Sequence, residues 1–240
     1  MTGIQVLPLE GIPEIEEGDD LAGLLAEAAE RVGGFETGDV LVVAQKAVSK
    51  AEGRVVALAE IAPSEEARAH AGDGDPRHVE VILRETVRVV RSRPPLVIAE
   101  TRHGFICASA GVDASNAPGA DTVVLLPLDP DASARALHER LRVAVIVSDS
   151  FGRPFRHGTT DVAIGVAGLA PLRDLRGTRD RSGYELKTTQ IAVADEIAGA
   201  AELVMGKADG IPAAIVRGLQ LGGDGSAVEL VMPPNRDLFR

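Results

Sequence analysis

An aspartate and a serine are followed by two arginines at one point of the chain, a combination that suits chemistry on phosphate groups. Asp149 and Ser150 come just after the apolar run 143–147, and Arg153 and Arg156 follow closely. The carboxylate and the hydroxyl supply oxygen ligands for Mg²⁺ or Mn²⁺, and the arginines can neutralise charge that develops on a phosphate. This stretch predicts phosphoryl transfer, with both arginines as catalytic residues. A strand-end aspartate that caps a turn beside solvated arginines is the alternative.

A second carboxylate lies among small residues in the segment GVDASN, residues 111–116. Small residues let the backbone come close to a ligand. Asp113 could bind a hard cation through oxygen, and Asn116 could form a hydrogen bond with a base or a sugar. An ordinary polar turn with an aspartate cap is the alternative, and on this motif alone the turn is favoured.

Two lysines follow the apolar run 40–44. Lys46 and Lys50 are four residues apart, so they would share one face if this stretch were helical. A lysine here would suit the phosphates of a nucleotide, although the glycines of a Walker P-loop do not precede it. A solvated basic face is an equal alternative. The later segment GKADG, residues 206–210, carries glycines that a helix end needs in any case.

The composition argues against several other kinds of chemistry. The five histidines lack the spacing of a metal site, Cys107 has no histidine near it, and there is no GxSxG motif. Acidic residues number 36 against 25 basic ones, and aromatic residues make up only 2% of the 240, which argues against nucleic-acid binding. A single cysteine allows no internal disulfide. With no leader or membrane-spanning run recognised in the sequence, these features predict a cytoplasmic protein.

Apolar periodicity and capping signals predict the elements that must position these residues. Hairpin-like pairs interrupt any regular βαβ rhythm, so we expect an α+β fold of mixed sheets with interspersed helices and not a doubly wound parallel sheet. Strands are predicted at 4–7, 40–44, 96–99, 105–109, 122–126, 143–147, 213–216 and 228–232. Helices are predicted at 20–33, from Pro76 with a pattern that runs to Val90, at 131–141 and at 191–205, and mobile loops at 64–77 and 173–183.

Six segments, taken together and in order, resemble the coenzyme F420-0:L-glutamate ligase family. They are LPLEGIPEIEEGDDL, GDVLVVAQKAVSKAEGR, AGVDASN, SDSFGRPFRHG, VADEIA and IPAAIVRGL, and they span nearly the whole chain. The resemblance implies that GTP phosphorylates the carboxylate of F420-0 and that the amine of L-glutamate attacks the acyl phosphate. The γ-carboxylate of each added glutamate could then be extended in turn.

The same resemblance implies a wider set of properties. It implies a gamma-glutamyl-ligase-like fold and an intertwined homodimer whose sites lie near the subunit interface. It implies Mg²⁺ or Mn²⁺, with a monovalent cation as a further option, and the small-molecule substrates F420-0, L-glutamate and GTP, with no nucleic acid or membrane. We expect residues 1–240 to form one unit, without the fused nitroreductase-like domain that some actinobacterial relatives carry.

Residue roles follow from the resemblance by position. The metal ligands would be Asp113, Asp149 and Ser150, the last at a place where the family often has threonine. The residues that would bind the nucleotide are Ile12, Pro13, Glu14, Ile15, Gln45, Lys46, Lys50, Asn116, Met205, Gly206, Lys207, Ala208, Asp209, Gly210 and Ile211.

Two positions depart from the family pattern. Gln45 and Lys46 stand where relatives carry small hydroxyl residues, so the nucleotide contact there is expected to differ. Lys207 stands where relatives can carry an acidic metal ligand, in a segment that is one residue shorter. A second metal ion is therefore left open: either Asp209 takes over as the ligand, or Lys207 supplies positive charge in place of the ion.

Two other functions compete with the ligase. Two carboxylates with arginines also suit a metal-dependent phosphohydrolase, which would release phosphate to water. The chain could alternatively be a non-catalytic nucleotide-binding module of a larger fused protein. The mass of the product separates the first from a ligase, and binding without turnover would identify the second.

Overall fold

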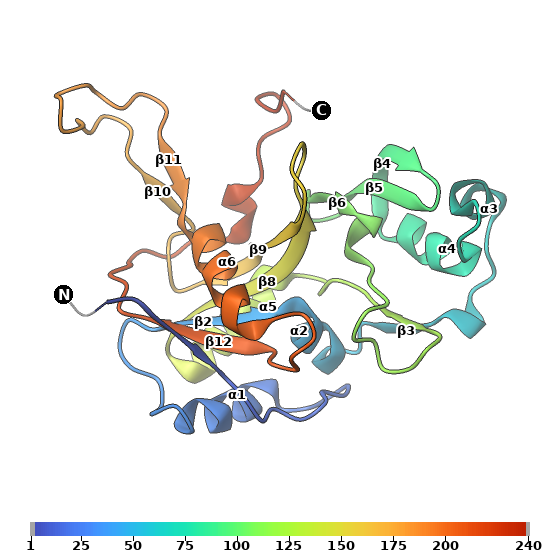
Figure 1. Ribbon diagram of the computed structural model, residues 1–240, viewed down its shortest axis with the longest axis horizontal. Coiled ribbons are helices and arrows are strands. Elements are labelled where there is room, and N and C mark those ends of the chain that lie inside the picture. The colour runs from blue at the N-terminus through green and yellow to red at the C-terminus, as the bar shows by residue number, and fades with distance from the viewer. Residues whose placement is uncertain (1–2, 239–240) are drawn as a thin grey trace.

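A mixed five-stranded sheet forms the centre of the computed structural model, which describes residues 3–238 (Figure 1). The strands lie in the order β1 (Gln5–Pro8), β12 (Ala213–Arg217), β2 (Val40–Ala44), β8 (Ala144–Gly152) and β9 (Thr159–Ala167). Only β2 and β8 run parallel in this sheet, and every other neighbouring pair is antiparallel. The strands expected at 4–7, 40–44, 143–147 and 213–216 are confirmed.

Helices cover both faces of this sheet, which explains the continuous apolar sequence of β2. On one face, Leu41 and Val43 pack in a core with α1 (Leu21–Glu30) and α5 (Pro130–Leu141). On the other face, Val40 and Val42 pack in a core with α6 (Val193–Met205). The short helix α2 (Gln45–Ala51) follows β2 directly, so the two lysines do lie on a helix.

A smaller lobe, on the right of Figure 1, carries its own apolar core. Its strands are β3 (Val55–Ala57) paired with β7 (Thr122–Val124), and the sheet β4 (Thr86–Arg93), β5 (Leu96–Thr101) and β6 (Ile106–Ala108). Its helices are α3 (Glu65–Ala71) and α4 (Pro76–Arg84), with the 3₁₀ turns η1 (Leu58–Glu60) and η2 (Ser109–Gly111). The hairpin expected around residues 101–104 is confirmed as β5 and β6.

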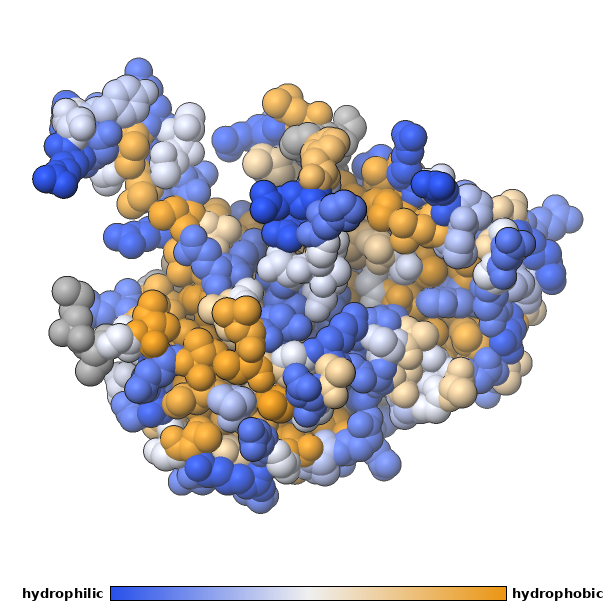
Figure 2. All heavy atoms as spheres, in the orientation of Figure 1, coloured by the Kyte–Doolittle hydropathy of each residue, from blue (hydrophilic) through white to orange (hydrophobic). Residues whose placement is uncertain are grey.

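A two-stranded arm, β10 (Leu172–Asp174) with β11 (Gln190–Ala192), extends away from the sheet in Figure 1. Figure 2 shows that this arm is covered mainly by hydrophilic residues, whereas hydrophobic residues gather over β1, β12 and α6. None of the helices within residues 3–238 is long and apolar enough to cross a membrane.

Four expectations about local structure are wrong. The helix begun by Asp75 ends at Arg84, and Val87 and Val90 lie in β4, where pairing with β5 outweighs their helical spacing. Residues 228–232 are not a strand, because Ser226 and Glu229 form a capping box that begins the 3₁₀ helix η3 (Ala227–Leu230).

The helix expected from residue 191 begins at Val193, since residues 190–192 pair with β10. The stretch expected as a mobile loop from residue 64 contains α3, whose first turn is capped by Ser64. The mixed α+β class is confirmed. The homodimer and the extent of the folding unit stay predictions.

Candidate functional site

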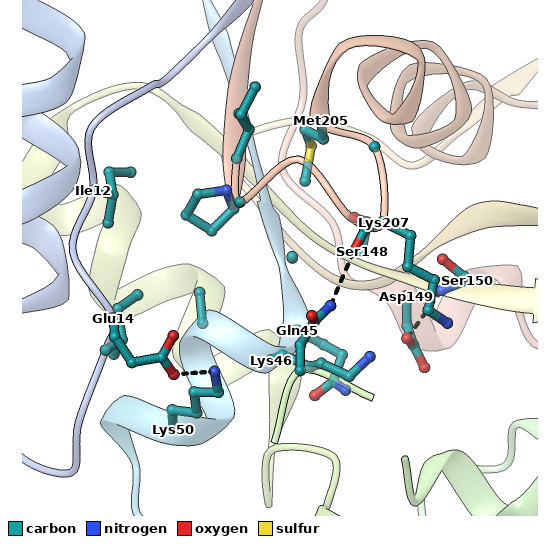
Figure 3. Close-up of a pocket in the computed structure, with 18 of the residues that line it drawn as sticks. Ile12, Glu14, Gln45, Lys46, Lys50, Ser148, Asp149, Ser150, Met205 and Lys207 are labelled. Carbon is teal, nitrogen blue, oxygen red and sulfur yellow. Dashed lines mark hydrogen bonds and ion pairs between the residues drawn. The ribbon is translucent and has the colours of Figure 1, made fainter. Parts of the chain in front are cut away.

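A pocket of about 420 Å³ lies where β2 ends and its parallel neighbour β8 continues (Figure 3). Ala44 and Ser148 form the last pair between the two strands, so Asp149 and Ser150 extend past the end of β2. Ligands of mixed and parallel sheets commonly bind at such carboxyl ends, and the volume suits a small-molecule ligand. The pocket is lined by Ile12, Pro13, Glu14, Ile15, Ala44, Gln45, Lys46, Ala47, Lys50, Asn116, Ala117, Pro118, Ser148, Asp149, Ser150, Asp161, Glu202, Met205, Gly206, Lys207, Gly210, Ile211 and Pro212.

Most of the residues singled out in the sequence converge on this pocket, although they come from five distant segments. Its wall is formed by residues 12–15, the helix α2, residues 116–118, the end of β8 and the segment 205–211. Two of the predicted nucleotide contacts, Ala208 and Asp209, are exposed and do not line it. The Asp209 carboxylate lies against Gly206, where an added Cβ would be 2.1 Å from one of its oxygens.

Asp113 lies beside the pocket and is held by two lysines. Lys46 Nζ donates to Asp113 Oδ2 at 2.6 Å, and Lys207 Nζ lies 3.5 Å from the same oxygen. The Ser115 backbone N–H and hydroxyl also donate to this carboxylate, at 2.7 and 2.8 Å. Burial alone would raise the pKa of Asp113, but the Lys46 ammonium and the Ser115 donors outweigh it and lower that pKa to about 2. Asp113 is therefore ionised at any physiological pH.

The pKa of Asp149 is shifted in the opposite direction to that of Asp113. Within residues 3–238, its carboxylate accepts one hydrogen bond, from the Ser150 backbone N–H at 2.9 Å. Burial raises the pKa of Asp149 to about 7, and the nearby Asp161 and Asp113 carboxylates raise it further, against the lowering effect of Lys46 and the Ser150 N–H. Because the ionised form of this carboxylate is disfavoured, a cation that replaces the proton would stabilise it strongly.

Asp161 is a pocket residue that the sequence did not reveal. It is buried in β9, and the hydroxyls of Ser148 and Ser150 donate to its two oxygens at 2.8 and 2.6 Å. A register shift between β8 and β9 beside Ser148 brings these side chains together. The strand β9 was not predicted, although a lone aspartate inside the apolar stretch TTDVAIGVA was a usable signal.

Glu202 is the second pocket residue that was missed. It lies half-buried near the end of α6, in the last turn before Met205. Burial raises the pKa of Glu202, and Asp161 and Asp209 add to this effect, against Lys207 and Lys46. Its helix was predicted, but a single acidic residue on an amphipathic helix gave no reason to expect a site.

The opposite end of the pocket holds a buried lysine. Figure 3 shows the Lys50 and Glu14 ion pair at one end, and Asp149, Ser150 and Lys207 at the other. Gln45 lies between them and is 1% exposed. Its Oε1 accepts from Ser49 at 2.8 Å, while its Nε2 has no hydrogen-bond partner in the part of the chain described. This end offers an ammonium group and an amide donor to a ligand.

Arg153 and Arg156 are not brought into this pocket. They lie in the exposed turn between β8 and β9, where Arg153 donates to the His157 carbonyl at 3.2 Å. Asn116 lines the pocket, and its side-chain amide donates to the Lys207 carbonyl at 3.0 Å, which fixes the loop after α6.

The donor set at the carboxylate end suits a hard divalent cation. Asp113, Asp149 and Ser150 offer carboxylate and hydroxyl oxygens, the ligands that Mg²⁺ and Mn²⁺ prefer. No group of three or more His, Cys, Asp or Glu side chains is arranged around one point within residues 3–238, so a cation here would also need oxygens from its substrate or from water. Asp149, poorly supplied with donors, is the residue best suited to hold it.

Comparison with known proteins finds similar chains over nearly the whole length of this one. A family model described as F420-0:Gamma-glutamyl ligase matches residues 11–218. A protein of Methanopyrus kandleri named coenzyme F420:L-glutamate ligase is 49% identical over 257 aligned residues, which cover 100% of both chains. A protein of the same name from Methanothermobacter thermautotrophicus is 45% identical over 99% of both chains. Another from Archaeoglobus fulgidus is 43% identical over 99% of this chain and 96% of its own.

Proposed function

The chain belongs to the F420-0:gamma-glutamyl ligase family, and from this premise we propose that its pocket joins L-glutamate to coenzyme F420-0 with GTP as the phosphoryl donor. It is a ligase of coenzyme F420 biosynthesis, as its full-length relatives are named. The GTP dependence, the acyl-phosphate intermediate and the metal requirement are the parts that we infer.

One observation supports the proposal above all: the pocket has two chemically different ends within a single cavity (Figure 3). Ile12 and the buried Lys50 lie toward one end, which could accommodate a nucleotide base and a phosphate. Asp149 and Ser150 lie at the other. A nucleotide that spans both would present its terminal phosphate to the carboxylate end, where a second substrate can meet it.

The residues of the carboxylate end would then handle the charge of the transferred phosphoryl group. Lys46 and Lys207 place two ammonium groups near Asp113, and either can contact phosphate oxygens. Asp113, Asp149 and Ser150 would hold Mg²⁺ or Mn²⁺, which when bound neutralises the phosphate oxygens and orients them.

The proposed reaction balances in two steps. A carboxylate oxygen of F420-0 attacks the γ-phosphorus of GTP, the bond between that phosphorus and the bridging oxygen breaks, and GDP leaves. The amine nitrogen of L-glutamate then attacks the acyl carbon, an amide bond forms, and inorganic phosphate leaves with the electron pair of the broken carbon–oxygen bond. The same steps on the γ-carboxylate of the product would add further glutamates.

Product analysis tests this function against its rivals. The purified chain is incubated with F420-0, L-glutamate, Mn²⁺ and either GTP or ATP, and the products are measured by mass spectrometry with release of phosphate. A glutamylated coenzyme formed with GTP supports the ligase. Phosphate without an adduct would favour a phosphohydrolase, and nucleotide binding without turnover would favour a binding module.

A further inference from the structure

The Glu202 carboxylate lines the pocket without a direct ion-pair partner among residues 3–238. In the part of the chain described, its carboxylate makes no hydrogen bond and no ion pair, although it is half-buried and lines the pocket. Partial burial disfavours the ionised form of this carboxylate, and a ligand that supplies a positively charged donor would offset that cost. The side chain therefore points to a cationic group that arrives with a substrate.

The helix α6 places Glu202 at the end of the pocket where the proposed amide bond would form. At Gly199, α6 approaches β9 so closely that an added Cβ would lie 3.4 Å from the Thr160 hydroxyl and 3.8 Å from the Asp161 carbonyl. Glu202 follows Gly199 by three residues and so shares this face of the helix. Asp161 in turn accepts a hydrogen bond from the Ser150 hydroxyl, so Glu202 lies at the carboxylate end of the pocket.

Two lysines argue against a second divalent ion as the partner of Glu202. Lys46 and Lys207 both act electrostatically on its carboxylate, and both line the same pocket. Their positive charges oppose a further doubly charged ion more strongly than a singly charged group. A single organic ammonium carries half the charge of a divalent ion and is therefore the better partner.

We propose that Glu202 binds the α-ammonium of the incoming L-glutamate and accepts the proton that the nitrogen must lose before it attacks. This inference rests on the proposed function and names the residue that receives its amino-acid substrate. The α-ammonium gives one proton to the Glu202 carboxylate and becomes a neutral amine. That amine attacks the acyl carbon, phosphate departs with the electron pair of the broken bond, and the remaining surplus proton leaves with the phosphate.

The pKa of Glu202 is raised, chiefly by burial, and this agrees with such a role because it makes the carboxylate a better proton acceptor than an ordinary glutamate. The groups that face it are Asp161 on β9, Lys46 on α2, and Lys207 and Asp209 in the loop after α6.

The test is the variant Glu202→Gln, which keeps the shape of the side chain and removes its charge. We expect the KM for L-glutamate to rise about ten- to a hundredfold, the loss typical of a hydrogen bond to a charged group, while the Kd for GTP stays unchanged. Inhibition by glutarate, the same diacid without an amine, should not change. Glu196→Gln alters the same charge on an exposed residue of the same helix and should keep the wild-type KM.

Several results would overturn the assignment. They are an unchanged KM for L-glutamate in Glu202→Gln, an equal loss of affinity for L-glutamate and glutarate, or the loss of one bound Mn²⁺ per chain, counted by electron paramagnetic resonance. The last result would make Glu202 a metal ligand. Failure of the proposed function itself is recognised separately, because the wild-type chain would then form no glutamylated coenzyme.

Discussion

The affinity for Mn²⁺ should depend on pH through Asp149. With a pKa raised to about 7, this carboxyl group is mostly protonated in the ion-free protein at acidic pH. A cation that binds there must displace one proton. Asp113 cannot give the same dependence, because the Lys46 ammonium and the Ser115 donors lower its pKa to about 2 despite its burial, and it stays ionised.

The size of the effect follows from that one proton. With a pKa of about 7, the apparent Kd for Mn²⁺ should rise about tenfold between pH 8 and pH 6, and about ninetyfold between pH 8 and pH 5. The stability of the ion-free fold should depend on pH through the same group. The folded pKa lies above the ordinary value of 3.8, so protonated Asp149 favours the ion-free fold at low pH, and this stabilisation is lost as the pH rises through about 7.

Isothermal titration of Mn²⁺ into the ion-free protein at several pH values measures this slope directly. Asp149→Asn is the matched control, because it keeps the side-chain size and removes the titrating group. The variant should bind Mn²⁺ weakly and with little pH dependence between pH 5 and pH 8. A wild-type Kd that is constant over this range, or the same slope in Asp149→Asn, would refute the assignment of Asp149 as the ligand.

Two further predictions concern the nucleotide end and the scaffold. Lys50→Met should weaken GTP binding by roughly tenfold or more in a calorimetric titration, since the buried ammonium is lost while its exposed partner Glu14 can turn to solvent; unchanged affinity would place the phosphates elsewhere. Gly165→Ala should lower the free energy of unfolding by about 2 kcal/mol or more in urea denaturation, because the added Cβ would lie 2.2 Å from the Pro130 carbonyl oxygen. Gly152→Ala, which meets no atom within 4 Å, should stay within about 0.5 kcal/mol of wild type, and equal losses in both variants would contradict this packing argument.

The parts of the site that the sequence predicted are those whose signals are local. The apolar runs of β2 and β8 identified the two buried strands, because a strand buried on both faces needs no partner information to be recognised. Asp149 and Ser150 were expected just after the second run, whereas β8 continues through them to Gly152. The order of the family segments then indicated the nucleotide residues, most of which line the pocket.

The parts that the sequence did not predict depend on long-range contacts. Lys46 and Asp113 form an ion pair although they are 67 positions apart in the sequence, and no local pattern near either residue predicts this contact. Asp161 and Glu202 belong to elements whose mutual position is set by the close approach of α6 to β9 at Gly199. The arginines after Asp149 gave a strong local signal, yet the turn between β8 and β9 carries them away from the pocket. Their catalytic role stays a prediction.

The fate of one oxygen atom tests the ligase mechanism most directly. F420-0 carrying a heavy-oxygen label in its carboxylate is incubated with the chain, L-glutamate, GTP and Mn²⁺, and the inorganic phosphate is analysed by mass spectrometry. An acyl-phosphate intermediate predicts that each phosphate released with an amide bond carries one labelled oxygen, since the carboxylate oxygen leaves with it. Unlabelled phosphate alongside a glutamylated product would contradict the account.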